Sequence, residues 1–195
     1  MKLKLSYYSF LLPISLCIGC QNELAMPDNS WGFFTAKVNG RAWEKTFANA
    51  YQAVRGRDDL DSAKGNTIEI YSLLFDSGGV LEEELSFTNI PAKVGRYKVF
   101  PYNDRFNTNS GAVGSFLTTF IDFDMFRDQY EVLESEDNYL QIDECQDKGN
   151  REIKGRFNVT FVLRSKRASN SYEDTLGFTK GKFHTKIVPP IKRHL

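Results

Sequence analysis

The stretch FTAKVNGRAW (residues 34–43) decides the fold class of this chain. Its apolar residues alternate with polar ones up to Val38, which is typical of a strand that buries one face. The Asn39-Gly40 pair that follows supplies the two positive φ angles of a two-residue type I′ turn. The stretch therefore predicts a β-hairpin in which Ala36 lies opposite Trp43 and Val38 opposite the residue after the turn.

A second long alternating stretch, IKGRFNVTFVLRSKR, occupies residues 153–167. Together with NYLQIDEC (138–145) it predicts a hairpin across a polar turn, with one face of each strand buried. The residues expected on the buried face of the second strand are Ile153, Phe157, Val159, Phe161 and Leu163.

Further β-rich segments are separated by Gly, Asn and Pro. They cover 48–54, 67–75, 85–90, 95–100, 115–123 and 181–188. Many short strands at this spacing, without helices between them, predict an all-β protein: an antiparallel β-sandwich or a barrel-like form of it. One segment, FDMFRDQYEVL (123–133), also fits a helical face, so a short helix or an irregular strand is expected there.

The first twenty residues, MKLKLSYYSFLLPISLCIGC, have the features of an export signal. Two lysines precede an apolar run over 5–18, which is shorter than the ~20 residues needed to span a bilayer. Gly19 and Cys20 end this run in the manner of a bacterial lipobox, so we expect cleavage before Cys20 and a lipid on its sulfur. A plain signal peptide or a short buried helix is the alternative.

This interpretation divides the chain into four parts. They are a signal peptide (1–19), a lipidated cysteine with a polar tether (20–30), a β-sandwich domain (31–190) and a basic tail (191–195). The expected location is the cell envelope, as an outer-membrane lipoprotein that faces the periplasm or the surface. The expected partner is the membrane itself, through Cys20.

Composition limits the remaining functions. Lys and Arg number 25, as do Asp and Glu, so the net charge of zero gives no basic patch for nucleic acid. Aromatic residues make up 14% of the chain, which favours a large core. Cys145 would have no partner once Cys20 is lipidated, so no disulfide is expected.

The usual catalytic and metal-binding patterns are missing from the sequence, and no cofactor is expected. His184 lies between two lysines on a predicted strand, and His194 is next to last in the tail. Neither stands in a zinc-binding or nucleophile-activating motif, so both are expected to be solvated surface residues.

Carboxylates offer weaker candidates. Asp58, Asp59 and Asp61 could supply oxygen ligands for Ca²⁺, although their spacing departs from the EF-hand pattern. Acids from the run Glu82-Glu83-Glu84 and the pair Asp122/Asp124 could form the two-carboxylate set of a glycosidase.

Two tripeptides, Asp61-Ser62-Ala63 and Asp174-Thr175-Leu176, match a short Asp-Ser/Thr-apolar pattern for O-glycosylation. Both are expected in loops, as a bulky sugar requires. Ser62 and Thr175 are the candidate acceptors.

The chain resembles a group of small Bacteroidota lipoproteins in which one β-rich domain follows a lipobox. The resemblance is carried by Phe34, Ala36, Val38, Asn39, Gly40 and Trp43, and by the pairs Gly155/Phe157 and Gly181/Phe183. It implies residence in the cell envelope and no particular activity.

The sequence thus favours a membrane-anchored, non-catalytic binding module for a glycan, a peptide or an envelope protein. Trp31 and Trp43 are the aromatic residues that we expect to face a ligand. The alternatives are a carboxylate-based glycan-acting enzyme and a structural subunit of an envelope complex. A glycan binder should show exposed aromatic rings side by side, whereas an enzyme should show a pocket with converging polar groups.

Overall fold

The computed structural model describes residues 30–43, 50–58, 67–102, 112–122, 125–146, 149–166 and 173–188. Strands account for 79% of these residues, and no helix occurs among them. The all-β prediction is therefore confirmed. In particular, these ranges contain no helix with the length and hydropathy needed to cross a membrane.

Eleven strands form one continuous sheet. They are β1 (Phe33–Val38), β2 (Arg41–Trp43), β3 (Ala50–Asp58), β4 (Thr67–Asp76), β5 (Leu81–Pro91), β6 (Gly95–Pro101), β7 (Val113–Asp122), β8 (Met125–Val132), β9 (Tyr139–Cys145), β10 (Glu152–Lys166) and β11 (Thr175–Val188).

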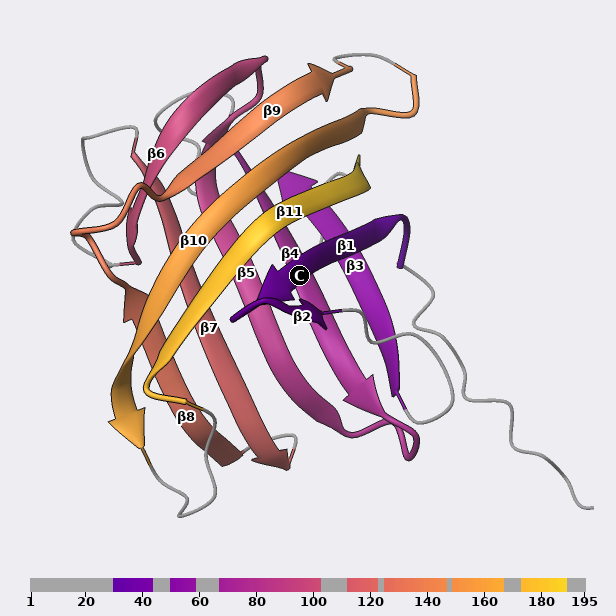
Figure 1. The fold of residues 1–195 in the computed structure, drawn as a ribbon. Helices are drawn as coiled ribbons and strands as arrows, with labels where there is room; N and C mark the ends of the chain where they lie inside the picture. Colours follow the sequence, from indigo (N-terminus) through magenta and orange to yellow (C-terminus); the bar gives the residue numbers. More distant parts are fainter. Residues whose placement is uncertain are drawn as a thin grey trace, which may run out of the picture.

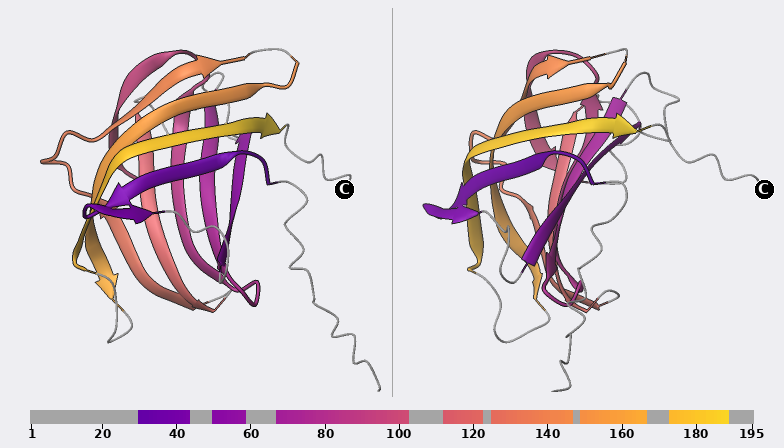
Figure 2. Two further views of the ribbon diagram at one scale, coloured as in Figure 1. Left: turned by 45° about the vertical axis from the view of Figure 1, so that its right-hand side comes forward. Right: turned by 90° about the vertical axis from the view of Figure 1, so that its right-hand side faces the viewer.

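The sheet closes on itself. Strands β3, β4, β5, β7, β6, β9, β10 and β11 pair in that order, and β11 pairs with β3 again. Strand β8 pairs with both β7 and β10, beyond the ends of β6 and β9. In Figure 1, β9, β10, β11 and β1 form a front layer that crosses over β3, β4, β5 and β7 behind it. Figure 2 shows the two layers from the side.

Closure adds two short parallel pairings, so the sheet is mixed, and it is consistent with the predicted β-sandwich or its barrel-like form. Strand β11 runs parallel to β3 at Ile187 and Val188, and β6 runs parallel to β7 at Val99–Pro101. Both parallel pairings are short and join strands at points where one strand changes partner. They close the sandwich into a barrel-like form.

The Asn39-Gly40 hairpin has the predicted register. Ala36 is paired with Trp43 and Val38 with Arg41, and the two turn residues have φ angles of 48° and 80°. The ambiguous segment 123–133 contributes strand β8 rather than a helix, because Tyr130 and Val132 alternate into the core beside β7. Pairing on both edges therefore decides against the helical pattern.

Aromatic side chains fill the space between the layers. The Phe34 ring lies 5.4 Å from that of Phe183 and 5.7 Å from that of Phe157, which in turn lies 5.3 Å from that of Phe87. The face predicted for β10 is confirmed: Ile153, Phe157, Val159 and Phe161 are buried, and Leu163 packs against the core. A single aromatic core thus supports both layers.

Two glycines make room for these rings. Gly155 on β10 is paired with Phe183 on β11, and Phe157 on β10 is paired with Gly181 on β11. Both glycines lie within their strands, since β10 begins at Glu152 and β11 at Thr175. Each glycine leaves the space that the opposite ring occupies.

Candidate functional site

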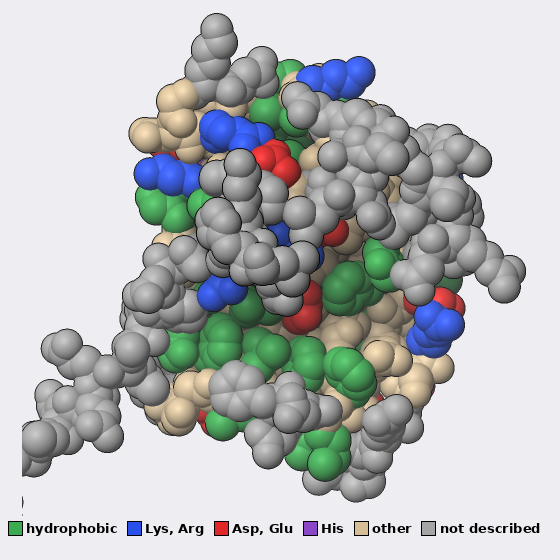
Figure 3. Space-filling view, turned by 180° about the vertical axis from the view of Figure 1, so that it is seen from behind, with side chains coloured by type: hydrophobic (Ala, Val, Ile, Leu, Met, Phe, Trp, Pro, Cys, Tyr) green, Lys and Arg blue, Asp and Glu red, His purple; other side chains and the backbone are tan. Residues whose placement is uncertain are grey.

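A concavity among the described residues lies on the outer face of the layer made by β3, β4, β5, β7 and β8. Two adjoining hollows of about 360 and 440 Å³ share Glu84, Tyr102 and Phe116. We call the combined feature the β5 groove, since β5 runs through its middle. Figure 3 views this side of the molecule and shows apolar side chains gathered on it, with acidic ones among them.

The alternation of β5 positions the polar side chains of the groove. Leu85 and Phe87 are fully buried between the layers. Because successive side chains of a strand point to opposite faces, Glu84, Ser86 and Thr88 point outward. These three residues line the groove as a polar row about 14 Å long at the usual rise per residue.

Strand register places an aromatic ring on each side of this row. Ser86 is paired with Tyr71 on β4 and with Phe116 on β7. Tyr102 lines both hollows, with its ring 5.4 Å from that of Phe116. Polar groups and aromatic rings therefore alternate across three adjacent strands.

Each hollow also has an Arg–Glu pair in its lining. Arg57 Nε contacts Glu69 Oε2 at 2.5 Å, and the Arg57 guanidinium lies 5.6 Å from the centre of the Tyr71 ring. In the other hollow, Arg164 Nε lies 3.8 Å from Glu131 Oε2. These contacts leave the two lining arginines largely matched in charge by neighbouring carboxylates.

Glu84 differs from these paired acids. Burial raises the pKa of its carboxyl group above the usual value. The Ser86 hydroxyl donates a hydrogen bond of 2.8 Å to Glu84 Oε1, which acts to lower the pKa, as does nearby Arg57, whereas Glu69 raises it. The groove therefore holds a desolvated carboxylate where its two hollows meet.

Thr88 gives an independent sign of a binding site. Its side chain is 7% exposed, and its hydroxyl has no hydrogen-bond partner within the described part of the chain. Gly114, beside it on β7, has space for only a hydrogen, since a Cβ there would lie 3.0 Å from Thr88 Oγ1. A hydroxyl without a partner at the wall of a groove is available to a polar ligand.

The two tryptophans predicted to face a ligand, Trp31 and Trp43, do not line the β5 groove. Trp43 is a core residue, 9% exposed, because its ring packs 5.2 Å from that of Phe178 and its indole N–H donates to buried Glu83 Oε1 at 2.9 Å. The prediction that Trp43 faces a ligand is therefore wrong. The turn at Asn39-Gly40 folds β2 so that this ring points inward.

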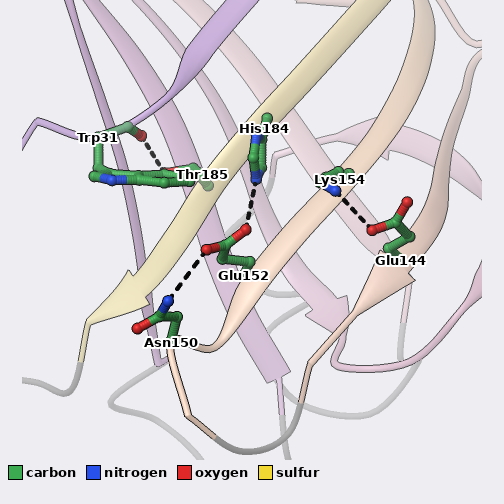
Figure 4. Close-up of polar contacts among 7 residues, drawn as sticks. All are labelled: Trp31, Glu144, Asn150, Glu152, Lys154, His184 and Thr185. Carbon is green, nitrogen blue, oxygen red and sulfur yellow. Dashed lines mark hydrogen bonds and ion pairs between the residues drawn. The ribbon is translucent and has the colours of Figure 1, made fainter.

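Trp31 belongs to a cluster on the opposite layer (Figure 4). Its ring lies 4.7 Å from that of His184, with Lys186 Nζ 4.2 Å from the ring centre. The Thr185 hydroxyl donates to the Trp31 carbonyl at 2.8 Å. These contacts occupy much of the ring, and they place Trp31 outside the β5 groove.

His184 points outward as expected, yet it is not simply solvated. Its side chain is 22% exposed, and Nε2 lies 3.1 Å from Glu152 Oε2. The hydrogen bond to His184 lowers the pKa of the Glu152 carboxyl group. Asn150 donates a longer hydrogen bond, 3.4 Å, to the other oxygen of the same carboxylate.

Of the three aspartates considered as Ca²⁺ ligands, only Asp58 lies among the described residues, and its carboxylate pairs with an arginine instead. Asp58 accepts two hydrogen bonds from Arg151, at 2.6 and 2.8 Å, and this contact lowers the pKa of its carboxyl group. Asp59 and Asp61 lie outside the described residues. Within the described ranges, no three His, Cys, Asp or Glu side chains are grouped to hold a metal ion.

The other predicted sites are distributed as follows. Thr175 has an exposed side chain but begins strand β11 rather than lying in a loop. Cys145 ends β9 and packs against the core. Glu83 faces the core while Glu84 faces the groove. Cys20, Ser62, His194, Asp124 and the side chain of Asp122 lie outside the described part of the structure.

Apart from Glu84, which belongs to the acidic run considered above, sequence reasoning missed the residues that form the groove. The segment LEEELSFTN (81–89) does carry a signal, since Glu84, Ser86 and Thr88 alternate with Leu85 and Phe87. That pattern shows which β5 side chains point outward, but it does not show which residues lie beside them. Only the register with β4 and β7 brings Tyr71 and Phe116 to the same row.

Comparison of the chain with protein-family models, with curated proteins and with solved structures found no match in any of the three.

Proposed function

We propose that this protein is a glycan-binding module and that its binding site is the β5 groove. The observation that carries the proposal is the polar row of β5 between Tyr71 and Phe116. A sugar ring has apolar C–H faces and a rim of hydroxyl groups. Flat aromatic rings can cover the faces while carboxylate and hydroxyl oxygens receive and donate hydrogen bonds at the rim.

The dimensions of the groove favour an extended ligand. Most of its lining residues come from the neighbouring strands β3, β4, β5, β7 and β8, and Tyr102 and Arg164 on β10 add to them. At about 4.8 Å between strands, this corresponds to roughly 19 Å across the layer. A chain of several sugar units laid across the strands would pass from one hollow to the other over Glu84.

A peptide ligand that adds a strand has less support. Such recognition requires an open sheet edge. Strand β11 is paired with β10 on one side and with β1 and β3 on the other, and β8 is paired on both sides. The described sheet leaves β2 as an end strand, and its three residues are short for strand addition. The groove offers side chains rather than backbone groups, which suits a ligand recognised by stacking and hydroxyl contacts.

We further propose that the domain is a lipoprotein of the cell envelope, attached to the outer membrane through Cys20. The support is the sequence of residues 2–20, with its lysines, apolar run and terminal Gly-Cys pair. Changing Cys20 to Ala and fractionating the cells tests this. The variant should leave the membrane fraction, and a variant that stays fully membrane-bound would count against the anchor.

Glycan binding is tested by calorimetric titration of the purified full chain with a panel of oligosaccharides. Tyr71→Ala and Phe116→Ala should each weaken binding about tenfold or more, because each removes a stacking surface at the centre of the site. Phe33→Ala is the matched control, since this ring is 44% exposed on the opposite layer. Equal affinity in all three variants would contradict the assignment of the groove.

A second candidate function, glycan hydrolysis, is favoured by one observation. Burial raises the pKa of Glu84, which is the property of a general acid in glycosidases. Glu69 and Glu131 line the same hollows and could supply the second carboxylate. Reducing-end release from a bound oligosaccharide, lost in Glu84→Gln, would favour hydrolysis over simple binding.

A further inference from the structure

We propose that Glu84 makes the β5 groove selective for charge: glycan units that are neutral or carry an amino group are accepted over β5, and units that carry a carboxylate or sulfate are excluded. This inference rests on the proposed glycan-binding function and names the class of glycan that the site takes. It assigns the specificity to one residue.

The charges that line the groove are unevenly matched. Arg57 contacts Glu69 and Arg164 lies near Glu131, so each arginine has a carboxylate beside it. Glu84 forms no salt bridge within the described part of the chain, and its hydrogen bond comes from the neutral Ser86 hydroxyl. The lining therefore has three acids and two bases, with the unmatched negative charge at Glu84.

The position of Glu84 gives this charge its influence. Glu84 belongs to both hollows, and its register partners are the uncharged Leu73 on β4 and Thr118 on β7. A ligand that crosses the groove must place one unit over this carboxylate. Neither of these register partners is basic, so neither can neutralise an anionic group of the ligand.

Partial burial strengthens the effect. Charges near a desolvated carboxylate are screened less by water than charges at an exposed surface. An anionic group on the ligand would be repelled, whereas a hydroxyl or an ammonium group would donate a hydrogen bond to the Glu84 oxygens. The Glu84–Ser86 contact fixes one oxygen and leaves the other for the ligand.

Protonation of Glu84 should weaken the exclusion of acidic glycan units from the groove. Burial raises the pKa of this carboxyl group, so it takes up a proton at a higher pH than an exposed glutamate does. The charged groups that face it are Arg57 from β3, Glu69 from β4, Glu131 from β8 and Arg164 from β10. Lowering the pH towards the pKa of Glu84 should therefore improve binding of acidic glycans more than of neutral ones.

The experiment titrates the full chain, and its Glu84→Gln variant, with three oligosaccharides of equal length: a neutral one, one that carries free amino groups and one made of uronic acids. In the wild type, the uronic acid oligomer should bind at least tenfold more weakly than the other two. Glu84→Gln should reduce this difference to threefold or less, because the uronic acid oligomer is no longer repelled. Glu144→Gln, which removes a carboxylate that pairs with Lys154 on the opposite layer, should leave the difference unchanged.

The outcomes separate this inference from the proposed function. Equal affinity for all three oligomers in the wild type would overturn the charge selection and leave glycan binding intact. A difference that persists in Glu84→Gln would overturn the role of Glu84. Binding of none of the three by the wild type would overturn glycan binding itself.

Discussion

The paired glycines of β10 and β11 allow a quantitative test of the core. A Cβ on Gly181 would lie 2.6 Å from three carbons of the Phe157 ring. That is about 1 Å closer than carbon atoms pack at their optimal separation. Overpacking of this kind costs typically about 1–3 kcal/mol, so Gly181→Ala should lower the free energy of unfolding by that amount.

Gly155 should behave differently, although it occupies the equivalent place. A Cβ there would lie 2.6 Å from Phe183 Cζ but also 2.1 Å from the backbone oxygen of Gln141 on β9. A ring can turn away, whereas a backbone oxygen can move only if β9 separates from β10. We expect Gly155→Ala to cost more than about 3 kcal/mol, at or beyond the upper end of ordinary overpacking.

Double mutants distinguish the two clashes. In a Phe157→Ala background, which itself costs about 3–5 kcal/mol, Gly181→Ala should cost nearly nothing because the ring is gone. In a Phe183→Ala background, Gly155→Ala should still cost more than about 2 kcal/mol, since the Gln141 oxygen remains. Urea denaturation followed by circular dichroism measures each value, provided that the slope with denaturant stays constant.

A third glycine variant serves as the control for the two predicted clashes. Gly177→Ala, whose nearest contact would be Asn39 Oδ1 at 3.4 Å, should cost less than about 1 kcal/mol. If Gly181→Ala costs the same with and without the Phe157 ring, the ring is not what the glycine accommodates. If the cost of Gly155→Ala disappears with Phe183, the backbone clash is not real.

Three further predictions concern polar contacts. Asp58→Asn should cost roughly 0.5–1 kcal/mol in urea denaturation, a modest value because both partners of the Asp58–Arg151 bridge are 30% exposed. The contact with Arg151 lowers the pKa of Asp58 in the folded state, so the stability difference between wild type and Asp58→Asn should be fully present above the unfolded pKa of about 3.9. It should disappear as the pH falls through the folded-state pKa. A stability difference that stays constant down to acid pH would contradict the Asp58–Arg151 bridge. Trp43→Phe should cost about 1.5–3 kcal/mol, since the indole N–H donates to the buried Glu83 carboxylate, and a Trp43→Phe melting curve that matches the wild type would refute this. Asn39→Ala should lower the free energy of unfolding, measured by calorimetry, by about 2 kcal/mol. Asn39 has a φ of 48°, and its side chain accepts a hydrogen bond from Gly177 N and donates one to the Thr175 carbonyl. Asn39→Gly keeps the turn but loses these side-chain hydrogen bonds, so it should retain part of the stability.

Local patterns made the hairpins predictable. The Asn39-Gly40 turn fixes its own register, because a two-residue loop leaves only one way to pair Ala36 and Trp43. Alternation likewise identified the buried face of β10. These features depend on residues close together in the sequence, which is why sequence alone was sufficient for them.

The closure of the sheet could not be predicted from local sequence patterns. The partner of β3 at Gly56 is Ile187, and nothing in either local sequence marks that pairing or its parallel direction. The segment that forms β8 fits a helix as well as a strand, and contacts with β7 and β10 decide between them. The β5 groove also depends on strand register, since its aromatic rings come from β4 and β7, which pair with β5 on either side.

The Gly56–Ile187 pairing also has a consequence for the order of folding. Contacts between residues so far apart in the chain form slowly, since a long loop must close first. A chain that emerges with its amino end leading cannot seat β3 against β11 until the last strand is available. The domain therefore becomes a closed structure only when nearly its whole length is available.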